Sequence, residues 1–182
     1  KSRFKLAWEC PTKLYYAADP TRYPSTKESP FLQALAEGGY QVGELAKVMH
    51  PGGVEVTTLD EARALADTAK LLERKDVTVF EAALGVSDEN LLVRVDVLRK
   101  KGKALHLVEV KAKSYDPERG GFFNTRGELE AGWVPYLVDI AFQTYVARRA
   151  RPGATVKSSL LLANKRAVAT VDGIHQRFLA RR

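Results

Sequence analysis

Two neighbouring apolar segments each carry one carboxylate, and this pattern limits the fold more than any other feature of the chain. Residues 92–98 read LVRVDVL and residues 105–111 read LHLVEVK. Both segments are apolar on both faces, which is typical of central strands in a sheet that helices cover. An ionised carboxylate in such a strand is costly unless it is paired or bound to a metal. Asp96 and Glu109 are therefore the first candidates for a functional site.

The strand period predicts which of these side chains meet. Residues two apart on a strand share a face, so Glu109 and Lys111 should point the same way. If the two strands form a hairpin that turns at Lys101-Gly102, Asp96 lies opposite Leu107. Asp96 would then share a face with Glu109, its diagonal neighbour.

Two carboxylates and a lysine at one site suit metal-dependent phosphate chemistry. The acids offer the hard oxygen ligands that Mg²⁺ prefers, and the metal makes a bound water a better nucleophile. Lys111 would position or deprotonate that water and stabilise charge in the transition state. The alternative is a buried ion pair between Lys111 and one acid, which leaves the second acid unexplained.

The remaining segments predict one α/β domain over residues 1–182. We expect a central mixed sheet flanked by helices, in the order helix–strand–strand–strand–helix–strand. The core would span about 29–163, after a helical segment at 1–28 and before a basic segment at 164–182. The expected helices are two short ones in 2–17, then 30–37, 40–49 after a break at Gly38-Gly39, 59–74 behind a capping box at Thr58–Glu61, 135–149 and a short one near 174–179; the expected strands are 77–84, 91–98, 104–112 and 155–163.

The positive charge is concentrated at one end of the chain. The net charge is +7, and residues 148–182 hold nine of the 29 Lys and Arg residues but one of the 22 Asp and Glu residues. A basic end favours a polyanionic partner such as nucleic acid, and a solvated surface is the equally good alternative.

Other features of the composition limit the class of protein. No apolar run approaches the length of about 18 residues that a membrane helix needs, and we expect a cytoplasmic protein without a membrane partner. Cys10 is the single cysteine, which excludes a multi-cysteine metal site within this chain. The one methionine is Met49, so we expect Lys1 not to be a native start; the chain is either trimmed or part of a longer parent protein, which could carry further domains.

The spacing of the charged residues resembles that of a known nuclease superfamily. Asp96 is followed thirteen residues later by Glu109-Val110-Lys111, and this pattern resembles the PD-(D/E)XK nucleases. Three further features resemble their RecB-like branch. The first is Ser2 with Cys10-Pro11 and Tyr15-Tyr16, and the second is the strand segment Val93–Asp96, although Arg94 stands where small residues are usual. The third is Gln143, in the helix that follows the strand of Lys111. The blocks at Val42–Ala46, Glu81–Leu84 and Val93–Ala112 resemble those in the nuclease-like N-terminal region of a larger bacterial family of unassigned function, and the resemblance covers about residues 2–163.

The resemblance implies a restriction-endonuclease-like core and a set of roles. Asp96 and Glu109 would bind Mg²⁺ or Mn²⁺ together with the Val110 carbonyl, and Lys111 would be catalytic. Glu81 would orient the site or help to hold a second metal, or would be a partly exposed strand acid. The expected activity is hydrolysis of nucleic-acid phosphodiester bonds, with DNA favoured over RNA; the alternative is a catalytically inactive module that binds nucleic acid or scaffolds a larger enzyme.

The resemblance also implies residues that contact nucleic acid, although the sequence differs from the family pattern at several positions. The expected contacts are Lys113, Ser114, Arg119, Arg126, Gln143 and Tyr145. The branch usually has a metal-binding histidine in its first core helix, where this chain has Lys47, so His50 and Glu44 remain as substitutes. A surface histidine and an ordinary exposed glutamate are the alternatives for these two. The three further cysteines of iron–sulfur members are missing, so no cluster is expected and Cys10 should be a small core residue.

Overall fold

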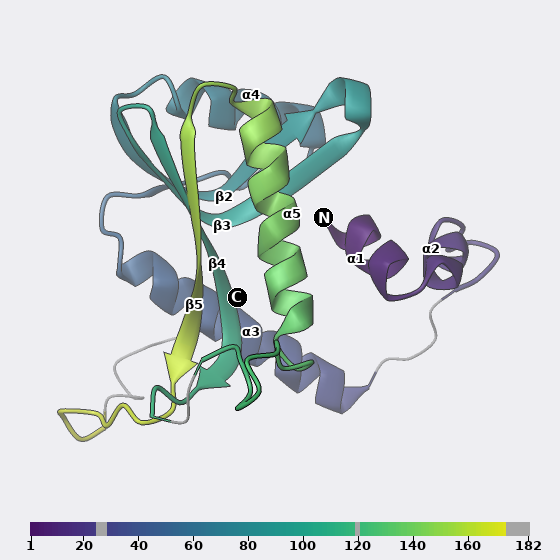
Figure 1. Cartoon of the computed structure of the whole chain (residues 1–182). Helices are drawn as coiled ribbons and strands as arrows, with labels where there is room; N and C mark the ends of the chain where they lie inside the picture. The colour runs from purple at the N-terminus through teal and green to yellow at the C-terminus, as the bar shows by residue number, and fades with distance from the viewer. Residues whose placement is uncertain (25–28, 119–120, 174–182) are drawn as a thin grey trace.

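The computed structural model describes residues 1–24, 29–118 and 121–173, and these form a five-stranded mixed sheet flanked by helices (Figure 1). The strands follow one another across the sheet in chain order. Strands β2, β3 and β4 form an antiparallel meander, whereas β1 pairs with β2 and β5 pairs with β4 in parallel. The strands are β1 (Val54–Glu55), β2 (Asp76–Val86), β3 (Leu91–Lys101), β4 (Ala104–Tyr115) and β5 (Thr155–Asn164). The predicted α/β architecture and its element order are confirmed, and the two-residue strand β1 is an addition.

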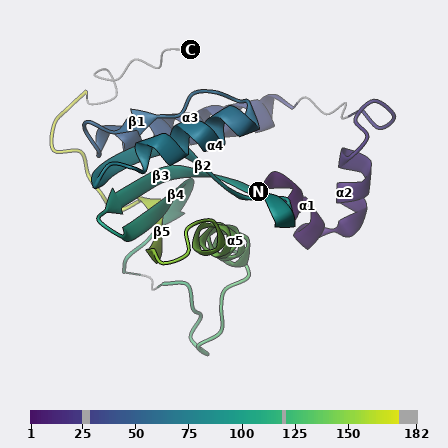
Figure 2. The ribbon, with the colours of Figure 1, turned by 90° about the horizontal axis from the view of Figure 1, so that it is seen from above.

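The helices cover both faces of the sheet. In Figure 2, α3 and α4 lie on one face and α5 lies on the other. Helix α1 lies next to α5, with α2 farther from the sheet, and the Phe4 ring stacks on the Phe142 ring at 4.0 Å between centroids. The helices are α1 (Ser2–Glu9), α2 (Pro11–Ala17), α3 (Pro30–Val48), α4 (Glu61–Leu71) and α5 (Val134–Ala150), with a 3₁₀ turn at Ser87–Glu89.

The β3–β4 hairpin differs in register from the prediction. Lys101 pairs with Ala104 and Leu98 pairs with Leu107, so the expected pairing of Asp96 with Leu107 is wrong by two residues. The turn is formed by Gly102 and Lys103, and Gly102 has a φ of +58°. Because glycine adopts positive φ without steric cost, it takes the first turn position. A shift of two residues alone would leave the face of each side chain unchanged.

The β2–β3 ladder, however, skips Glu81 and Asp96, and Asp96 lines a cleft on the α3 side of the sheet whereas Glu109 contacts Gln143 of α5. The expectation that Asp96 shares a face with Glu109 is therefore wrong.

Two predicted helix boundaries are also wrong. The chain does not break at Gly38-Gly39, because α3 is one continuous helix from Pro30 to Val48. Thr58 does not cap α4; the Asp60 carboxylate accepts a hydrogen bond from the Arg63 amide at 2.8 Å instead. Aspartate is as good an N-cap as threonine, and it lies nearer to the first helical turn. The short helix expected near 174–179 lies outside the described residues.

The core fills both sides of the central strands. A large cluster that includes Leu98, Leu107 and Val146 contains residues from the sheet and from helices α4 and α5, and a smaller one joins Phe80, Val97 and Val108. None of the helices in the described parts of the chain is long and apolar enough to cross a membrane. The same central strands that carry this core also carry the two acids.

Candidate active site

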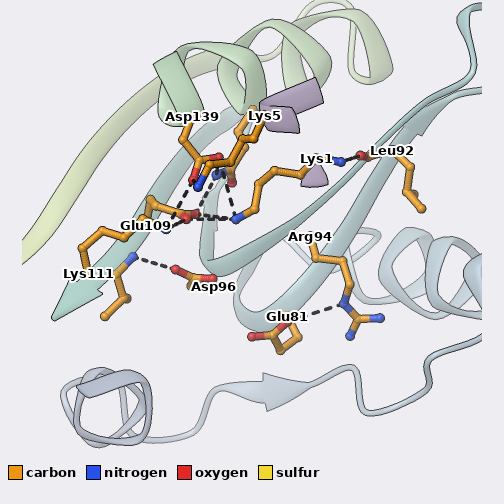
Figure 3. Close-up of polar contacts among 11 residues, drawn as sticks. Lys1, Lys5, Glu81, Leu92, Arg94, Asp96, Glu109, Lys111 and Asp139 are labelled. Atoms are coloured by element: carbon orange, nitrogen blue, oxygen red, sulfur yellow. Dashed lines mark hydrogen bonds and ion pairs between the residues drawn. The ribbon is translucent and has the colours of Figure 1, made fainter. Parts of the chain in front are cut away.

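The candidate site lies where strands β3 and β4 separate. Their ladder runs from the Lys101–Ala104 pair to the Val97–Val108 pair and ends there. The next residues are Asp96 on β3 and Glu109 on β4. The Asp96 Oδ2 atom accepts a hydrogen bond from the main-chain amide of Val110 at 2.6 Å, so a carboxylate takes the place of the missing ladder partner (Figure 3).

Glu109 is fully buried and surrounded by donors. Its side chain is 0% exposed, and the Lys111 ammonium contacts its Oε1 atom. The Gln143 Nε2 atom donates to Oε2 at 2.6 Å, and Lys1 Nζ donates to Oε1 and Oε2 at 2.9 and 3.1 Å. Burial alone would raise the pKa of Glu109, but the charges of Lys1 and Lys111 and the hydrogen bonds from Lys111 and Gln143 lower it to about 2. Glu109 is therefore ionised at neutral pH.

A third carboxylate, Asp139 on α5, lies beside this pair. It is 1% exposed, and its Oδ2 atom is 3.3 Å from Lys111 Nζ. Lys1 and Lys5, both on the N-terminal segment, reach its two oxygen atoms at 3.9 Å. Within the described residues Asp139 Oδ2 accepts no hydrogen bond, and neither does the buried Gln143 Oε1 atom.

Sequence reasoning did not select Asp139, Lys1 or Lys5 as site residues. Asp139 lies one turn before Gln143 on α5, and Gln143 Nε2 donates a hydrogen bond to its Oδ1 atom at 3.3 Å. A signal for Asp139 was available, because it is an acid on the mainly apolar helix α5. Nothing in the local sequence of Lys1 and Lys5 indicates their position, which depends on how α1 packs against α5.

The two strand acids have opposite electrostatic environments. Burial and the negative charge of Glu109 raise the pKa of Asp96 to about 6. Burial would lower the pKa of Lys111, but the charge and hydrogen bond of Glu109 raise it overall. Lys111 is therefore protonated at neutral pH, and the site holds a buried acid that does not ionise easily next to one that does.

Asp96 also faces a cleft on the other side of the sheet. This cleft, between α3 and the sheet, has a volume of about 630 Å³ and is lined by Asp96, Glu81 and Glu44 among others. Figure 3 shows Asp96 between the Glu109–Asp139 group and the pair of Glu81 and Arg94. Glu81 Oε2 lies 3.4 Å from Arg94 Nε, and Glu81 has a φ of +53° in the middle of β2. Glu81 and Glu44 are thus on the cleft side of the site, away from Asp139.

His50 and Tyr145 lie away from the acids. His50 follows the end of α3, and burial together with the charge of Arg99 lowers its pKa. Tyr145 is 51% exposed and its hydroxyl donates to Glu89. The site roles of His50 and Tyr145 stay predictions.

The other predicted contacts are spread over the end of β4 and the loop that follows. Lys113 Nζ lies 4.6 Å from the centre of the Trp133 ring, in a cation–π contact, and Ser114 pairs with Ala163 after a bulge in β4. Arg126 lies in the exposed loop before α5, and Arg119 lies outside the described residues. Cys10 is half-buried at the junction of α1 and α2, so its expected place in the core is wrong.

Comparisons with protein-family models, with curated proteins and with solved structures found no match.

The donor atoms of the site fit a hard divalent cation. Two carboxylates and a main-chain carbonyl are the ligands that Mg²⁺ uses, often with water completing its shell. Among the described residues no three of His, Cys, Asp and Glu are placed to hold a metal ion together. A cation held by Asp96 and Glu109 would need a main-chain carbonyl, such as that of Val110, or water molecules to complete its coordination. A metal ion bound to Glu109 would compete with the Lys1 ammonium, which lies 2.9 Å from Glu109 Oε1.

Proposed function

We propose that this chain is a metal-dependent nuclease with a restriction-endonuclease-like fold, and that it hydrolyses phosphodiester bonds in nucleic acid, with DNA as the expected substrate. The observation that carries the proposal is that Asp96, Glu109 and Lys111 meet where two apolar central strands separate. Charged groups that are costly to bury and have shifted pKa values are typical of functional sites. The helix–meander–helix–strand order, with β5 parallel to β4, is compatible with the same fold.

In this proposal the protein groups divide the work between holding the cation and stabilising the phosphate. Asp96 and Glu109 would hold Mg²⁺ or Mn²⁺, and Gln143 would keep Glu109 in place through its 2.6 Å hydrogen bond. The metal, when bound, would activate a water molecule and offset the charge of the phosphate. The Lys111 ammonium would stabilise charge that develops on a phosphate oxygen. Asp139, 3.3 Å from Lys111 Nζ, would fix the direction of that ammonium.

A second candidate function is a catalytically inactive module that binds nucleic acid. The contact between Lys1 and Glu109 favours it, because an ammonium group already neutralises the acid that would bind the metal. Such a module would bind nucleic acid in a salt-dependent way without taking up a metal or forming products.

One experiment separates the two candidates. Mn²⁺ is titrated into the protein by calorimetry, and the protein is then incubated with end-labelled DNA and RNA in Mg²⁺, in Mn²⁺ and in EDTA. The nuclease proposal predicts metal uptake and products that appear with either metal and not in EDTA. Salt-dependent binding without metal uptake or products would support the inactive module.

A further inference from the structure

Arg94 is an unusually well-fixed arginine on the floor of the cleft. Its Nη1 atom donates to the Thr58 carbonyl at 2.7 Å, and its Nη2 atom donates to the Val56 carbonyl at 2.6 Å. Its Nε atom lies 3.4 Å from Glu81 Oε2. A free arginine loses much rotamer freedom when it binds a ligand, and here that freedom is already restricted.

The cleft leaves part of the guanidinium available. A guanidinium has five N–H donors, and the two carbonyls use one on each terminal nitrogen. One N–H therefore remains on each terminal nitrogen, and the side chain is 27% exposed. The other lysine or arginine of the cleft lining, Lys47, donates to both Glu44 and Glu55 at 2.6 Å. Lys47 therefore has one of its three N–H donors left and lies between two carboxylates, whereas Arg94 keeps one donor on each terminal nitrogen.

Arg94 and the strand acid Asp96 are joined by a local irregularity in the sheet. The β2–β3 ladder passes from the Phe80–Val97 pair to the Ala82–Val95 pair, so Glu81 and Asp96 lie opposite each other outside it. Glu81 has a positive φ, which is rare for a residue with a side chain and is found most often at functional sites. The irregularity brings Glu81, Asp96 and Arg94 to the same cleft.

The opposite wall of the cleft, on α3, has space at two positions. Gly39 and Gly43 lie one turn apart on α3 and line the cleft, and a Cβ atom built on either would have no neighbour within 4 Å. A backbone phosphate can therefore approach Arg94 between α3 and the sheet without meeting a side chain at these two positions.

We propose that Arg94 binds a non-bridging oxygen of a nucleic-acid backbone phosphate in the cleft between α3 and the sheet, next to the phosphodiester bond that the Asp96 site cleaves. This inference rests on the proposed nuclease function for its substrate. Arginine is suited to the role, because its planar fork matches the geometry of two phosphate oxygens. Arg94 is then a substrate-binding residue, and Glu81 is the positioning residue that holds it.

The test compares two variants at this position with a control on the same strand. Arg94→Gln removes the charge and keeps an amide that can donate to one carbonyl, and Arg94→Lys keeps the charge without the fork. Arg99→Lys is the control, because Arg99 is exposed on β3 and lies away from the cleft lining. Binding of a fluorescent DNA oligonucleotide is measured in EDTA across a range of salt concentrations, and KM and kcat are measured in Mg²⁺.

The account predicts distinct results for the two variants. Arg94→Gln should reduce the slope of log affinity against log salt by about one and raise KM about tenfold, with a smaller change in kcat. Arg94→Lys should have the wild-type salt slope but a raised KM, as in Arg94→Gln. Arg99→Lys should have the wild-type slope and the wild-type KM. If Arg94 had only a structural role, Arg94→Gln would lower the melting temperature but leave the salt slope and KM at their wild-type values. That result overturns the proposal. If Arg94→Gln does not fold, an unchanged KM in Arg94→Lys overturns it.

The same measurements separate this inference from the proposed function. Binding in EDTA with an Arg94-dependent salt slope, but without cleavage in Mg²⁺, would retain the phosphate contact and contradict the nuclease. Cleavage by the wild type with an unchanged slope and KM in Arg94→Gln would retain the nuclease and contradict the phosphate contact. A wild-type protein that neither binds nor cleaves would contradict both.

Discussion

The carboxylate of Asp96 accepts a hydrogen bond from the main-chain amide of Val110, at 2.6 Å, at the point where strands β3 and β4 separate. A single contact therefore satisfies an amide that the ladder leaves free and places an acid on the central sheet. Because Glu109 is the residue before Val110, the same contact keeps the two acids close, and the charge of Glu109 helps to raise the pKa of Asp96 to about 6. This arrangement stores an unfavourable charge interaction that a bound cation would relieve.

Replacing Asp96 by asparagine should stabilise the metal-free protein at pH 8. The folded pKa of Asp96, about 6, is above its ordinary value of 3.8, so its ionisation opposes folding. The penalty is absent below about pH 3.8 and complete above about pH 6, where it reaches roughly 3 kcal/mol. Urea unfolding in EDTA should therefore show Asp96→Asn to be more stable than the wild type at pH 8 and equally stable at pH 3.5.

The control for this prediction is Asp67→Asn, on the exposed side of α4, where Asp67 is 50% exposed. That change should alter the free energy of unfolding by less than about 0.5 kcal/mol at either pH. An Asp96→Asn variant that is less stable than the wild type at pH 8 would show that Asp96 is not held at an electrostatic cost.

Replacing Glu109 by glutamine should destabilise the protein at neutral pH. Removal of its charge leaves Lys111 and Lys1 with Asp139 as their carboxylate partner. The substitution also loses the interactions that lower the pKa of Glu109 from 4.5 to about 2, which correspond to about 3 kcal/mol at pH 7. Its folded pKa, about 2, is below the ordinary value of 4.5, so its contribution is present above pH 4.5 and is lost as the pH falls towards 2. The difference between wild type and Glu109→Gln in urea unfolding should shrink over that range.

A double-mutant cycle checks the cause of that loss. Lys111→Met in the Glu109→Gln background should cost less than Lys111→Met in the wild type, because the ion pair is already absent. Additive losses would mean that Glu109 and Lys111 contribute independently, contrary to their direct contact.

Alanine at the two glycines of the cleft wall should separate stability from activity. Gly39→Ala and Gly43→Ala each lie inside α3 in open space, so each should stabilise the helix by about 0.5–1 kcal/mol. Their methyl groups would project into the cleft, and the double variant should cleave nucleic acid several-fold more slowly. Gly38→Ala is the matched control, since Gly38 is on the same helix in open space but does not line the cleft. Equal cleavage rates in all three proteins would exclude this cleft as the substrate path.

The sequence was sufficient to predict the sheet and two of its charged residues. Alternation and apolar runs located strands β2 to β5 to within three residues at each end, because burial on both faces leaves a strong local signal. The acids in those runs were conspicuous for the same reason. The predicted register was shifted because the position of a two-residue turn depends on the φ of Gly102, which the strand pattern does not encode.

The features that were missed depend on contacts between distant segments. Asp139 and Lys1 meet Glu109 only after α5 and α1 pack together, and no local pattern reports that packing. The continuity of α3 through Gly38-Gly39 has a similar origin, because isolated glycines weaken a helix without ending it when the flanking residues favour it. The positive φ of Glu81 is a property of the β2–β3 pairing around Asp96, and alternation alone predicts an ordinary strand there.

The most direct test of the nuclease proposal is the rate at which purified protein cleaves labelled DNA in Mn²⁺, compared with Asp96→Asn and Lys111→Met. Circular dichroism and thermal melting establish that each variant is folded. The account predicts metal-dependent cleavage by the wild type that falls at least a hundredfold in both variants. Undiminished cleavage in both folded variants would contradict it.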